Sequence, residues 1–195
     1  MIAGIILAAG ASSRMGSPKA LLDYRGEMFI ARLVRVLSGA CDPVIVALGY
    51  HVDTIRPAIK GTGTIVINPA PERGQLSSLQ TALAALPPDT EGFAFIPVDS
   101  PAVEPSTVES LRAAFLKRGS ATRFVIPRYQ GKRGHPVFAT RAIAEELLAL
   151  PPTGKDSDVV HSHVPDTVYV DVDDPGILVD IDDPAAYRQV TESQS

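Results

Sequence analysis

The feature that most constrains this chain is the alternation of apolar, β-branched segments with segments in which apolar residues recur at helical spacing. A continuous apolar run is typical of a strand buried on both faces of a parallel sheet, and helical spacing is typical of the amphipathic helices that cover it. We expect strands at 2–7, 43–48, 64–68, 92–98 and 122–127, and helices at 28–37, 78–86, 106–115 and 140–148. The sequence therefore predicts an α/β fold with a Rossmann-like, mostly parallel, doubly wound sheet and helices on both faces.

The length of 195 residues is enough for one such domain with a proper core. No internal repeat, low-complexity tract or long linker divides the chain. We therefore expect a single domain over residues 1–191 and a frayed tail over residues 192–195. Serines near the start of several predicted helices are candidate N-caps.

Composition limits the partners and the compartment. The formal net charge of -4 argues against a nucleic-acid-binding surface, which needs a basic stripe. The one cysteine, Cys41, cannot form an intramolecular disulfide, which favours a reducing compartment. The N-terminal apolar run is short and has no basic segment before it, so we interpret it as a buried strand. We expect a cytoplasmic protein that binds neither nucleic acid nor membranes.

Small residues follow the first predicted strand, and two cations, Arg14 and Lys19, lie close behind. Backbone N–H groups in such a loop can approach phosphate oxygens. The glycines at 4, 10 and 16 do not match GxGxxG, and Gly16 is followed by Ser-Pro-Lys instead of the Lys-Ser or Lys-Thr of a P-loop. Spacing alone leaves two interpretations equally open: a phosphate site, and a plain turn with two solvated cations.

Carboxylates follow two of the extended segments. Asp99 comes directly after the predicted strand 92–98, at the carboxyl end where ligands bind in such sheets. A carboxylate there suits Mg2+, which prefers oxygen ligands. Asp180 and Asp182 alternate along an extended segment, so their side chains share one side. A turn or cap role for Asp99, and a merely solvated acidic run for the other two, remain open on this evidence.

Five segments resemble one family in order and spacing. They are LAAGASSRMGSPK at 7–19, GQLSSL at 74–79, DSPAV at 99–103, RGHP at 133–136 and DDPGILVDIDDP at 173–184. The first resembles the signature of nucleotidyltransferases with a glycosyltransferase-A-like fold. The set as a whole is most similar to their molybdenum cofactor cytidylyltransferase branch, which is MobA-like. The resemblance implies that fold, a loop that wraps a nucleotide triphosphate, and Mg2+ as cofactor.

The resemblance also implies roles for individual residues. Arg14, Lys19 and Asp99 are expected to be catalytic, and Asp99, Asp180 and Asp182 to hold the metal ion. The residues expected to bind the nucleotide are Leu7, Ala8, Ala9, Gly10, Ser12, Ser13, Arg14, Lys19, Gln75 and Ser78. Those expected to bind the acceptor substrate are Arg133, Gly134 and His135. Without the resemblance, helix capping would explain Ser77 or Ser78 equally well, and a structural role would explain His135 better.

The expected function is Mg2+-dependent transfer of CMP from CTP to a phosphorylated small molecule, above all molybdopterin carrying molybdenum, with release of pyrophosphate. Ala9 stands where guanylyltransferase relatives tend to have a second glycine, which favours CTP over GTP. A molybdoenzyme is a possible partner. The alternatives are a guanylyltransferase or sugar-phosphate nucleotidyltransferase of the same fold, a non-catalytic nucleotide-binding chaperone for a molybdoenzyme, and a nicotinamide-dependent oxidoreductase.

Overall fold

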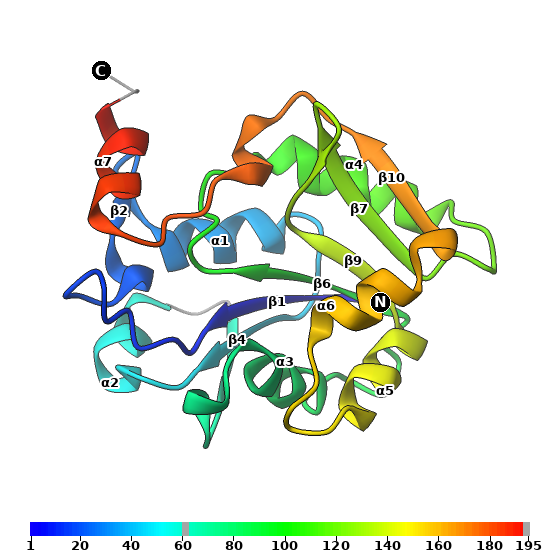
Figure 1. Cartoon of the computed structure of the whole chain (residues 1–195), viewed down its shortest axis with the longest axis horizontal. Coiled ribbons are helices and arrows are strands. Elements are labelled where there is room, and N and C mark those ends of the chain that lie inside the picture. The colour runs from blue at the N-terminus through cyan, green and yellow to red at the C-terminus, as the bar shows by residue number, and fades with distance from the viewer. Residues whose placement is uncertain (60–62, 193–195) are drawn as a thin grey trace.

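The computed structural model describes residues 1–59 and 63–192, and an eight-stranded sheet runs through it in the order β10-β7-β9-β6-β1-β4-β5, with β8 paired to β7 (Figure 1). The strands of this sheet are β1 (Ile2–Ala8), β4 (Val44–Leu48), β5 (Gly63–Ile67), β6 (Gly92–Pro97), β7 (Phe124–Tyr129), β8 (Lys132–Arg133), β9 (Val137–Thr140) and β10 (Thr167–Asp171). A separate antiparallel pair consists of β2 (Asp23–Tyr24) and β3 (Glu27–Met28). The α-helices are α1 (Phe29–Ser38), α2 (Val52–Ile55), α3 (Gln75–Leu83), α4 (Pro105–Leu116), α5 (Arg141–Ala149), α6 (Asp156–Ser162) and α7 (Pro184–Glu192).

The sheet is mostly parallel, as predicted. β1 pairs in parallel with β4 and with β6, β4 with β5, and β7 with β10. The exceptions are the short strand β8, which pairs antiparallel with β7, and β9, which lies antiparallel between β6 and β7. Because β9 runs in the opposite direction, its first residue, Val137, pairs with Phe95 near the carboxyl end of β6. The segment that leads into β9 therefore lies at the same edge of the sheet as the segment that follows β6.

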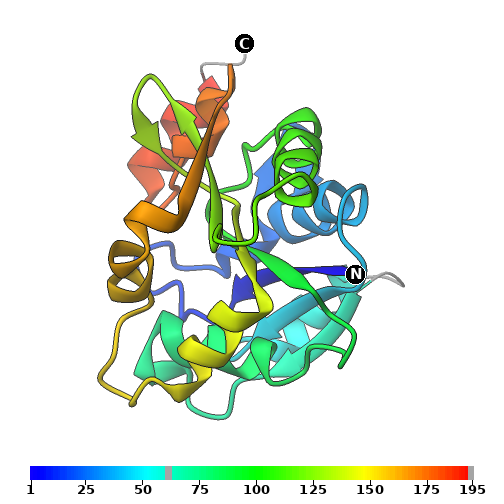
Figure 2. The same cartoon turned by 90° about the vertical axis from the view of Figure 1, so that its right-hand side faces the viewer.

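Helices cover both faces of the sheet (Figures 1 and 2). Ile2 and Ile6 of β1 belong to a core shared with α1 and α4, whereas Ala3, Ile5 and Leu7 belong to a second core shared with α3 and α5. Successive side chains of a strand point to opposite faces, so one continuous apolar run fills two cores. This explains why β1 has no polar position.

Two details differ from the sequence-based expectations. The prediction of serine N-caps is wrong. α3 begins at Gln75, not at residue 78, so Ser77 and Ser78 lie within its first turn. The helices α1, α3, α4 and α5 all begin without a hydrogen bond from a capping side chain. The sequence analysis does not predict the strands β2, β3, β8 and β9, because segments of two to four residues carry too little periodicity, and it does not predict the helices α6 and α7. Glu192 ends α7, and the rest of the predicted tail lies outside the described residues.

Two expectations from composition can also be compared with the structure. Cys41 is buried, and burial raises the pKa of its thiol to about 12, so the thiolate is scarce at neutral pH and the side chain is unreactive. Among the helices of residues 1–59 and 63–192, none is long and apolar enough to span a bilayer.

Candidate active site

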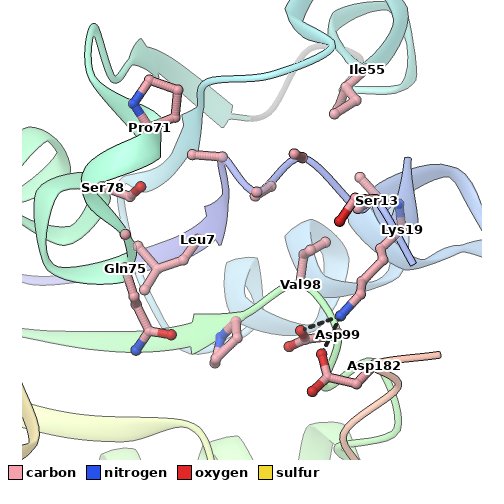
Figure 3. Close-up of a pocket in the computed structure, with 18 of the residues that line it drawn as sticks. Leu7, Ser13, Lys19, Ile55, Pro71, Gln75, Ser78, Val98, Asp99 and Asp182 are labelled. Atoms are coloured by element: carbon pink, nitrogen blue, oxygen red, sulfur yellow. Dashed lines mark hydrogen bonds and ion pairs between the residues drawn. The ribbon is translucent and has the colours of Figure 1, made fainter. Parts of the chain in front are cut away.

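The loop after β1 folds back on itself and forms one wall of a pocket (Figure 3). Ser12 and Gly16 both have positive φ angles, of 52° and 71°, which turn the chain sharply. The backbone N–H of Lys19 donates a hydrogen bond to Oγ of Ser12 at 3.0 Å and closes the loop. Lys19 then begins the short 3-10 helix η1 (Lys19–Leu21). The loop backbone, Arg14 and Lys19 therefore line the same cavity.

This first pocket has a volume of about 290 Å³ and lies beyond the carboxyl ends of β1 and β6, where the fold predicts a ligand. The first turn of α3 closes it on the other side. Oγ of Ser78 accepts a hydrogen bond from Nδ2 of Asn68 at 3.0 Å, and Nε2 of Gln75 donates to Oδ2 of Asp156 at 2.9 Å. All the residues predicted to bind the nucleotide line this pocket: Leu7, Ala8, Ala9, Gly10, Ser12, Ser13, Arg14, Lys19, Gln75 and Ser78.

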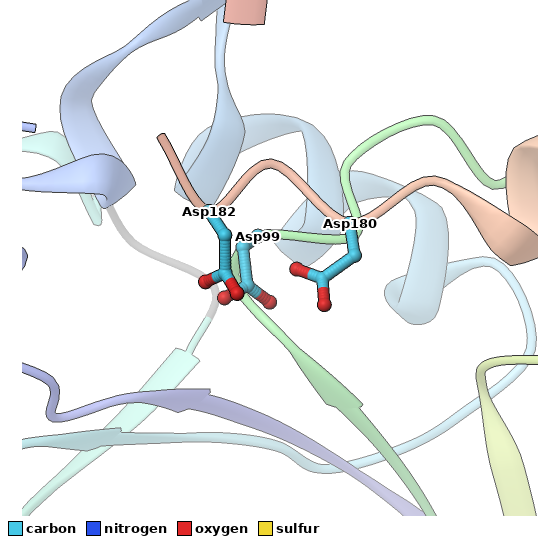
Figure 4. A group of neighbouring side chains, drawn as sticks. All are labelled: Asp99, Asp180 and Asp182. Atoms are coloured by element: carbon cyan, nitrogen blue, oxygen red, sulfur yellow. The ribbon is translucent and has the colours of Figure 1, made fainter. Parts of the chain in front are cut away.

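Three carboxylates converge beside the loop, although they come from distant parts of the chain (Figure 4). Asp99 follows β6, and Asp180 and Asp182 lie just before α7. The backbone N–H of Ile181 donates to the carbonyl of Asp99 at 2.9 Å, and the Ile181 side chain is fully buried. Asp180 and Asp182 therefore point the opposite way, toward Asp99. Each of the three offers a carboxylate oxygen within 4.8 Å of the others, which is close enough to hold one metal ion.

Two cations balance this negative charge. Nζ of Lys19 donates to Oδ2 of Asp99 at 3.0 Å and to Oδ1 of Asp182 at 2.6 Å (Figure 3), and Nη2 of Arg14 lies 3.3 Å from the same Asp182 oxygen. Burial lowers the pKa of Lys19, but hydrogen bonds and charge from Asp182 and Asp99 outweigh it, so the pKa lies above its ordinary value. The hydrogen bond from Lys19 lowers the pKa of Asp182. Lys19 is therefore charged at neutral pH, and so is Asp182.

Among residues 1–59 and 63–192, no cationic side chain forms an ion pair with Asp180. Partial burial, followed by the negative charges of Asp99 and Asp182, raises the pKa of Asp180. Ionisation of Asp180 therefore destabilises the folded protein at neutral pH. This destabilisation disappears as the pH falls through the raised pKa.

We therefore expect Asp180→Asn to raise the Tm of the metal-free protein at pH 7 by roughly 1–3 °C. Calorimetry in the presence of a chelator tests this, and the gain should shrink as the pH is lowered toward 4. Asp173→Asn is the matched control, because it removes an exposed carboxylate from the same acidic segment. A lower Tm for Asp180→Asn at pH 7 would show that the carboxylate stabilises the metal-free fold.

A second pocket, of about 580 Å³, contains the predicted acceptor residues Arg133, Gly134 and His135. Gly134 lies so close to the backbone of Ile177 that a Cβ atom would collide with the Ile177 carbonyl, and the N–H of His135 donates to this carbonyl at 3.2 Å. The His135 ring packs edge-on against Phe95, with 5.9 Å between ring centroids. Burial lowers the pKa of His135, so its ring is neutral at pH 7, and within the described residues its Nδ1 atom has no hydrogen-bond partner.

The two pockets meet at the carboxylates. Asp99, Asp182 and Gln75 line both, and Asp180 faces the second. A ligand in the first pocket and a ligand in the second would therefore meet beside Lys19 and the three acidic side chains. This arrangement suits the transfer of a charged group between two bound molecules.

Sequence reasoning missed two polar residues that support the site. Nδ2 of Asn68 donates to Oγ of both Ser77 and Ser78, at 2.8 and 3.0 Å, and so fixes the start of α3. Asn68 directly follows β5. The rule that ligands bind beyond the carboxyl ends of the strands, which pointed to Asp99, could therefore have pointed to Asn68 as well. Asp156 begins α6 and holds Gln75 across the boundary between the pockets. No local pattern marks Asp156, because its partner is distant in sequence.

Comparison with known proteins identifies relatives along most of the chain. Residues 4–168 match the family model of the MobA-like NTP transferase domain. A probable molybdenum cofactor guanylyltransferase of Bacillus cereus (strain ZK / E33L) is 34% identical over 153 residues, which make up 76% of this chain and 72% of the relative. The molybdenum cofactor cytidylyltransferase of Escherichia coli (strain K12) is 27% identical over 149 residues, or 75% of this chain and 74% of the relative.

Several solved structures share the fold of this chain. The crystal structure of Rv0371c from Mycobacterium tuberculosis H37Rv is 30% identical, with a TM-score of 0.80 and coverage of 98% of each chain. A complex of Rv0371c with manganese is 29% identical, with a TM-score of 0.76 and coverage of 98% of each chain. A 4-diphosphocytidyl-2C-methyl-D-erythritol synthase from Anaerococcus prevotii DSM 20548 is 16% identical, with a TM-score of 0.77 over 100% of this chain and 96% of its own. The predicted glycosyltransferase-A-like fold class is confirmed.

Proposed function

The chain belongs to the MobA-like NTP transferase family and is a nucleotidyltransferase, and we propose that it transfers CMP from CTP to a phosphorylated small molecule with the aid of a divalent metal ion. One observation carries this proposal. Asp99, Asp182 and Lys19 form a charged cluster at the junction of two pockets, one of which contains the whole predicted nucleotide loop. The geometry matches a reaction between two phosphate-bearing ligands.

The main obstacle to such a reaction is charge. Two unit charges about 4 Å apart repel by on the order of 4 kcal/mol at an effective dielectric constant near 20, and the two substrates bring several negative charges together. Arg14, Lys19 and the backbone N–H groups of the loop offset the charge of the triphosphate. The carboxylates Asp99, Asp180 and Asp182 fit a hard divalent cation, which would supply further charge neutralisation and Lewis acidity when bound.

The proposed step is a displacement at the α-phosphorus of the nucleotide. An oxygen of the acceptor phosphate forms the new P–O bond, and the bond from the α-phosphorus to the oxygen bridging the β-phosphate breaks. Pyrophosphate leaves with that electron pair, and the ammonium of Lys19 stabilises the charge that develops. A phosphate monoester, whose second pKa is about 6, is largely deprotonated at pH 7. No side chain therefore needs to remove a proton from the acceptor.

Two further choices are part of the proposal. We propose Mg2+ as the metal, and the manganese complex of Rv0371c supports a divalent cation more generally. We propose molybdopterin carrying molybdenum as the acceptor, on the strength of the relatives named as molybdenum cofactor transferases. Arg133 provides a cation in the second pocket for the acceptor, and His135 lines the same pocket.

Ala9 supports CTP as the nucleotide. Ala9 lines the first pocket and is 4% exposed, and a Cβ atom built on Gly49 would lie 3.0 Å from Ala9 Cβ. The Ala9 side chain therefore lies next to Gly49, a position with no room for a side chain of its own. Because guanylyltransferase relatives tend to have glycine where this chain has Ala9, we propose that the larger residue favours the smaller pyrimidine base over a purine.

The test is pyrophosphate release with each of the four nucleoside triphosphates, Mg2+ or Mn2+, and molybdenum-loaded molybdopterin. We expect CTP to be preferred. Preference for GTP, the nucleotide that the Bacillus relative's name implies, would retain the chemistry and replace the nucleotide. No release with any triphosphate, either metal, and a panel of phosphorylated acceptors would contradict the proposed reaction.

Ala9→Gly tests the nucleotide choice directly. Removal of one methyl group from a pocket changes discrimination by at least about tenfold, so the ratio of kcat/KM for CTP to that for GTP should fall by this factor. Thermal unfolding of Ala9→Gly serves as the control for folding. An unchanged ratio would show that Ala9 does not select the base.

A further inference from the structure

Asp174 is a buried carboxylate that lies outside both pockets and is 5% exposed. Its Oδ1 atom accepts a hydrogen bond from the backbone N–H of Gly176 at 2.8 Å. Its Oδ2 atom accepts two more, from the backbone N–H of Glu104 at 3.0 Å and from Oγ1 of Thr107 at 2.7 Å. Buried carboxylates are costly unless they are satisfied in this way, so the position calls for an explanation.

The partners of Asp174 belong to the two segments that carry the proposed metal ligands. Glu104 and Thr107 lie at the start of α4, shortly after Asp99, and the N-terminal end of a helix favours a negative charge. Gly176 lies in the 3-10 helix η5 (Pro175–Leu178), shortly before Asp180. One side chain thus connects the chain that follows Asp99 to the chain that precedes Asp180.

Further contacts make this junction tight. A Cβ atom on Gly176 would collide with the carbonyl of Ala102, so the two backbones touch. On its other side, the loop after Asp99 is held by the buried Arg32, whose Nε donates to the carbonyl of Pro101 at 2.7 Å and whose Nη2 donates to the carbonyl of Val103 at 3.1 Å. Through its hydrogen bonds to Glu104, Thr107 and Gly176, Asp174 connects this fixed loop to the C-terminal acidic segment.

We propose that Asp174 is a positioning residue for the metal site, because it sets the placement of Asp180 and Asp182 relative to Asp99. The proposal rests on the proposed function, in which these three carboxylates bind one divalent cation. Carboxylate ligands must meet such an ion at about 2.1 Å, so a small displacement of one segment weakens binding by all three. Groups that orient metal ligands from behind typically contribute 10- to 100-fold to metal affinity.

The experiment measures Mn2+ affinity without nucleotide, from the electron paramagnetic resonance signal of free Mn2+. Asp174→Asn should weaken binding by about 10-fold or more. Since Asp174→Asn is at risk of misfolding, Thr107→Val provides the milder test: it removes one hydrogen bond to Asp174, nearly preserves the shape of the side chain, and should weaken binding several-fold. Thr107→Ser keeps the hydroxyl group and should restore the wild-type affinity.

Two further measurements separate positioning from general stability. Leu147→Ala creates a cavity in the core on the opposite face of the sheet and should lower the Tm without changing Mn2+ affinity. In the metal-free protein, the Ile181 amide that donates to Asp99 should exchange its hydrogen faster in Thr107→Val than in Thr107→Ser.

The outcomes are distinct. Weaker Mn2+ binding and faster Ile181 exchange in Thr107→Val, with both restored in Thr107→Ser, would support the positioning role. Wild-type affinity in Thr107→Val and Asp174→Asn, or equal weakening in Leu147→Ala, would overturn it and leave the proposed function intact. Failure of the wild-type protein to bind Mn2+ at all would contradict the proposed metal site itself, and the positioning role with it.

Discussion

Lys19→Met is expected to lower the kcat of nucleotidyl transfer by about 100- to 1,000-fold, the usual effect of removing one preorganised donor that stabilises transition-state charge. Lys19 is the strongest candidate for such a donor because its ammonium group lies within hydrogen-bond distance of Asp99 and Asp182, at the junction of the two pockets. The charge that it offsets grows as pyrophosphate leaves. The loss should therefore be larger in kcat than in KM for the nucleotide, and steady-state kinetics at saturating metal separates the two.

The control for Lys19→Met is a measurement of the thermal stability of the variant. Because the acidic partners raise the pKa of Lys19, its charge stabilises the metal-free protein at neutral pH, and this contribution is lost only as the pH rises through the raised pKa. The variant should therefore have a lower Tm at pH 7 without metal, and added Mn2+ should restore much of it. A kcat within threefold of wild type would show that Lys19 only balances the acidic cluster.

Asp99→Asn is expected to reduce kcat/KM by about 1,000-fold or more, since a metal-bound phosphoryl group gains several kcal/mol of charge stabilisation and each 1.36 kcal/mol corresponds to tenfold in rate. Asp99 is the proposed metal ligand that follows the central strand β6, and it lines both pockets. Its replacement should also weaken Mn2+ binding measured without substrates. Turnover and Mn2+ affinity are thus two independent tests of the proposed role of Asp99 as a metal ligand.

The control for Asp99→Asn is a variant that also removes one negative charge. Asp173→Asn removes one negative charge from the exposed side of the acidic segment and should leave both Mn2+ affinity and turnover close to wild type. If Asp99→Asn kept its Mn2+ affinity but lost turnover, Asp99 would act on the substrate and not on the metal. If it kept both, the proposed site would be wrong.

Most of the fold was accessible from the sequence because β1, β4 and β6 are buried on both faces and read as unbroken apolar runs. The site was partly accessible for a related reason. Asp99 directly follows one of these runs, so its place at the carboxyl edge of the sheet followed from topology. The loop of small residues after β1 was equally visible, although its cations gained a role only through the family resemblance.

The remaining features depend on contacts between distant residues. The direction of β9 is set by pairing with β6 and β7, and nothing within its four residues indicates that pairing. The spacing of Asp180 and Asp182 placed them on one side of the chain but did not identify Asp99 as their neighbour. The hydrogen bond from Ile181 to Asp99 joins these segments, and it is visible only in three dimensions.

The antiparallel course of β9 has a consequence for how relatives of this chain can diversify. Because β9 starts at this edge of the sheet, the segment that carries Arg133 and His135 lines the second pocket, proposed here for the acceptor, and does not line the first. Under the proposed function, changes of length or composition in this segment can alter which molecule receives the nucleotide, while the residues that bind the triphosphate stay constant. The fold thereby separates two specificities, so that evolution or engineering can modify one and retain the other.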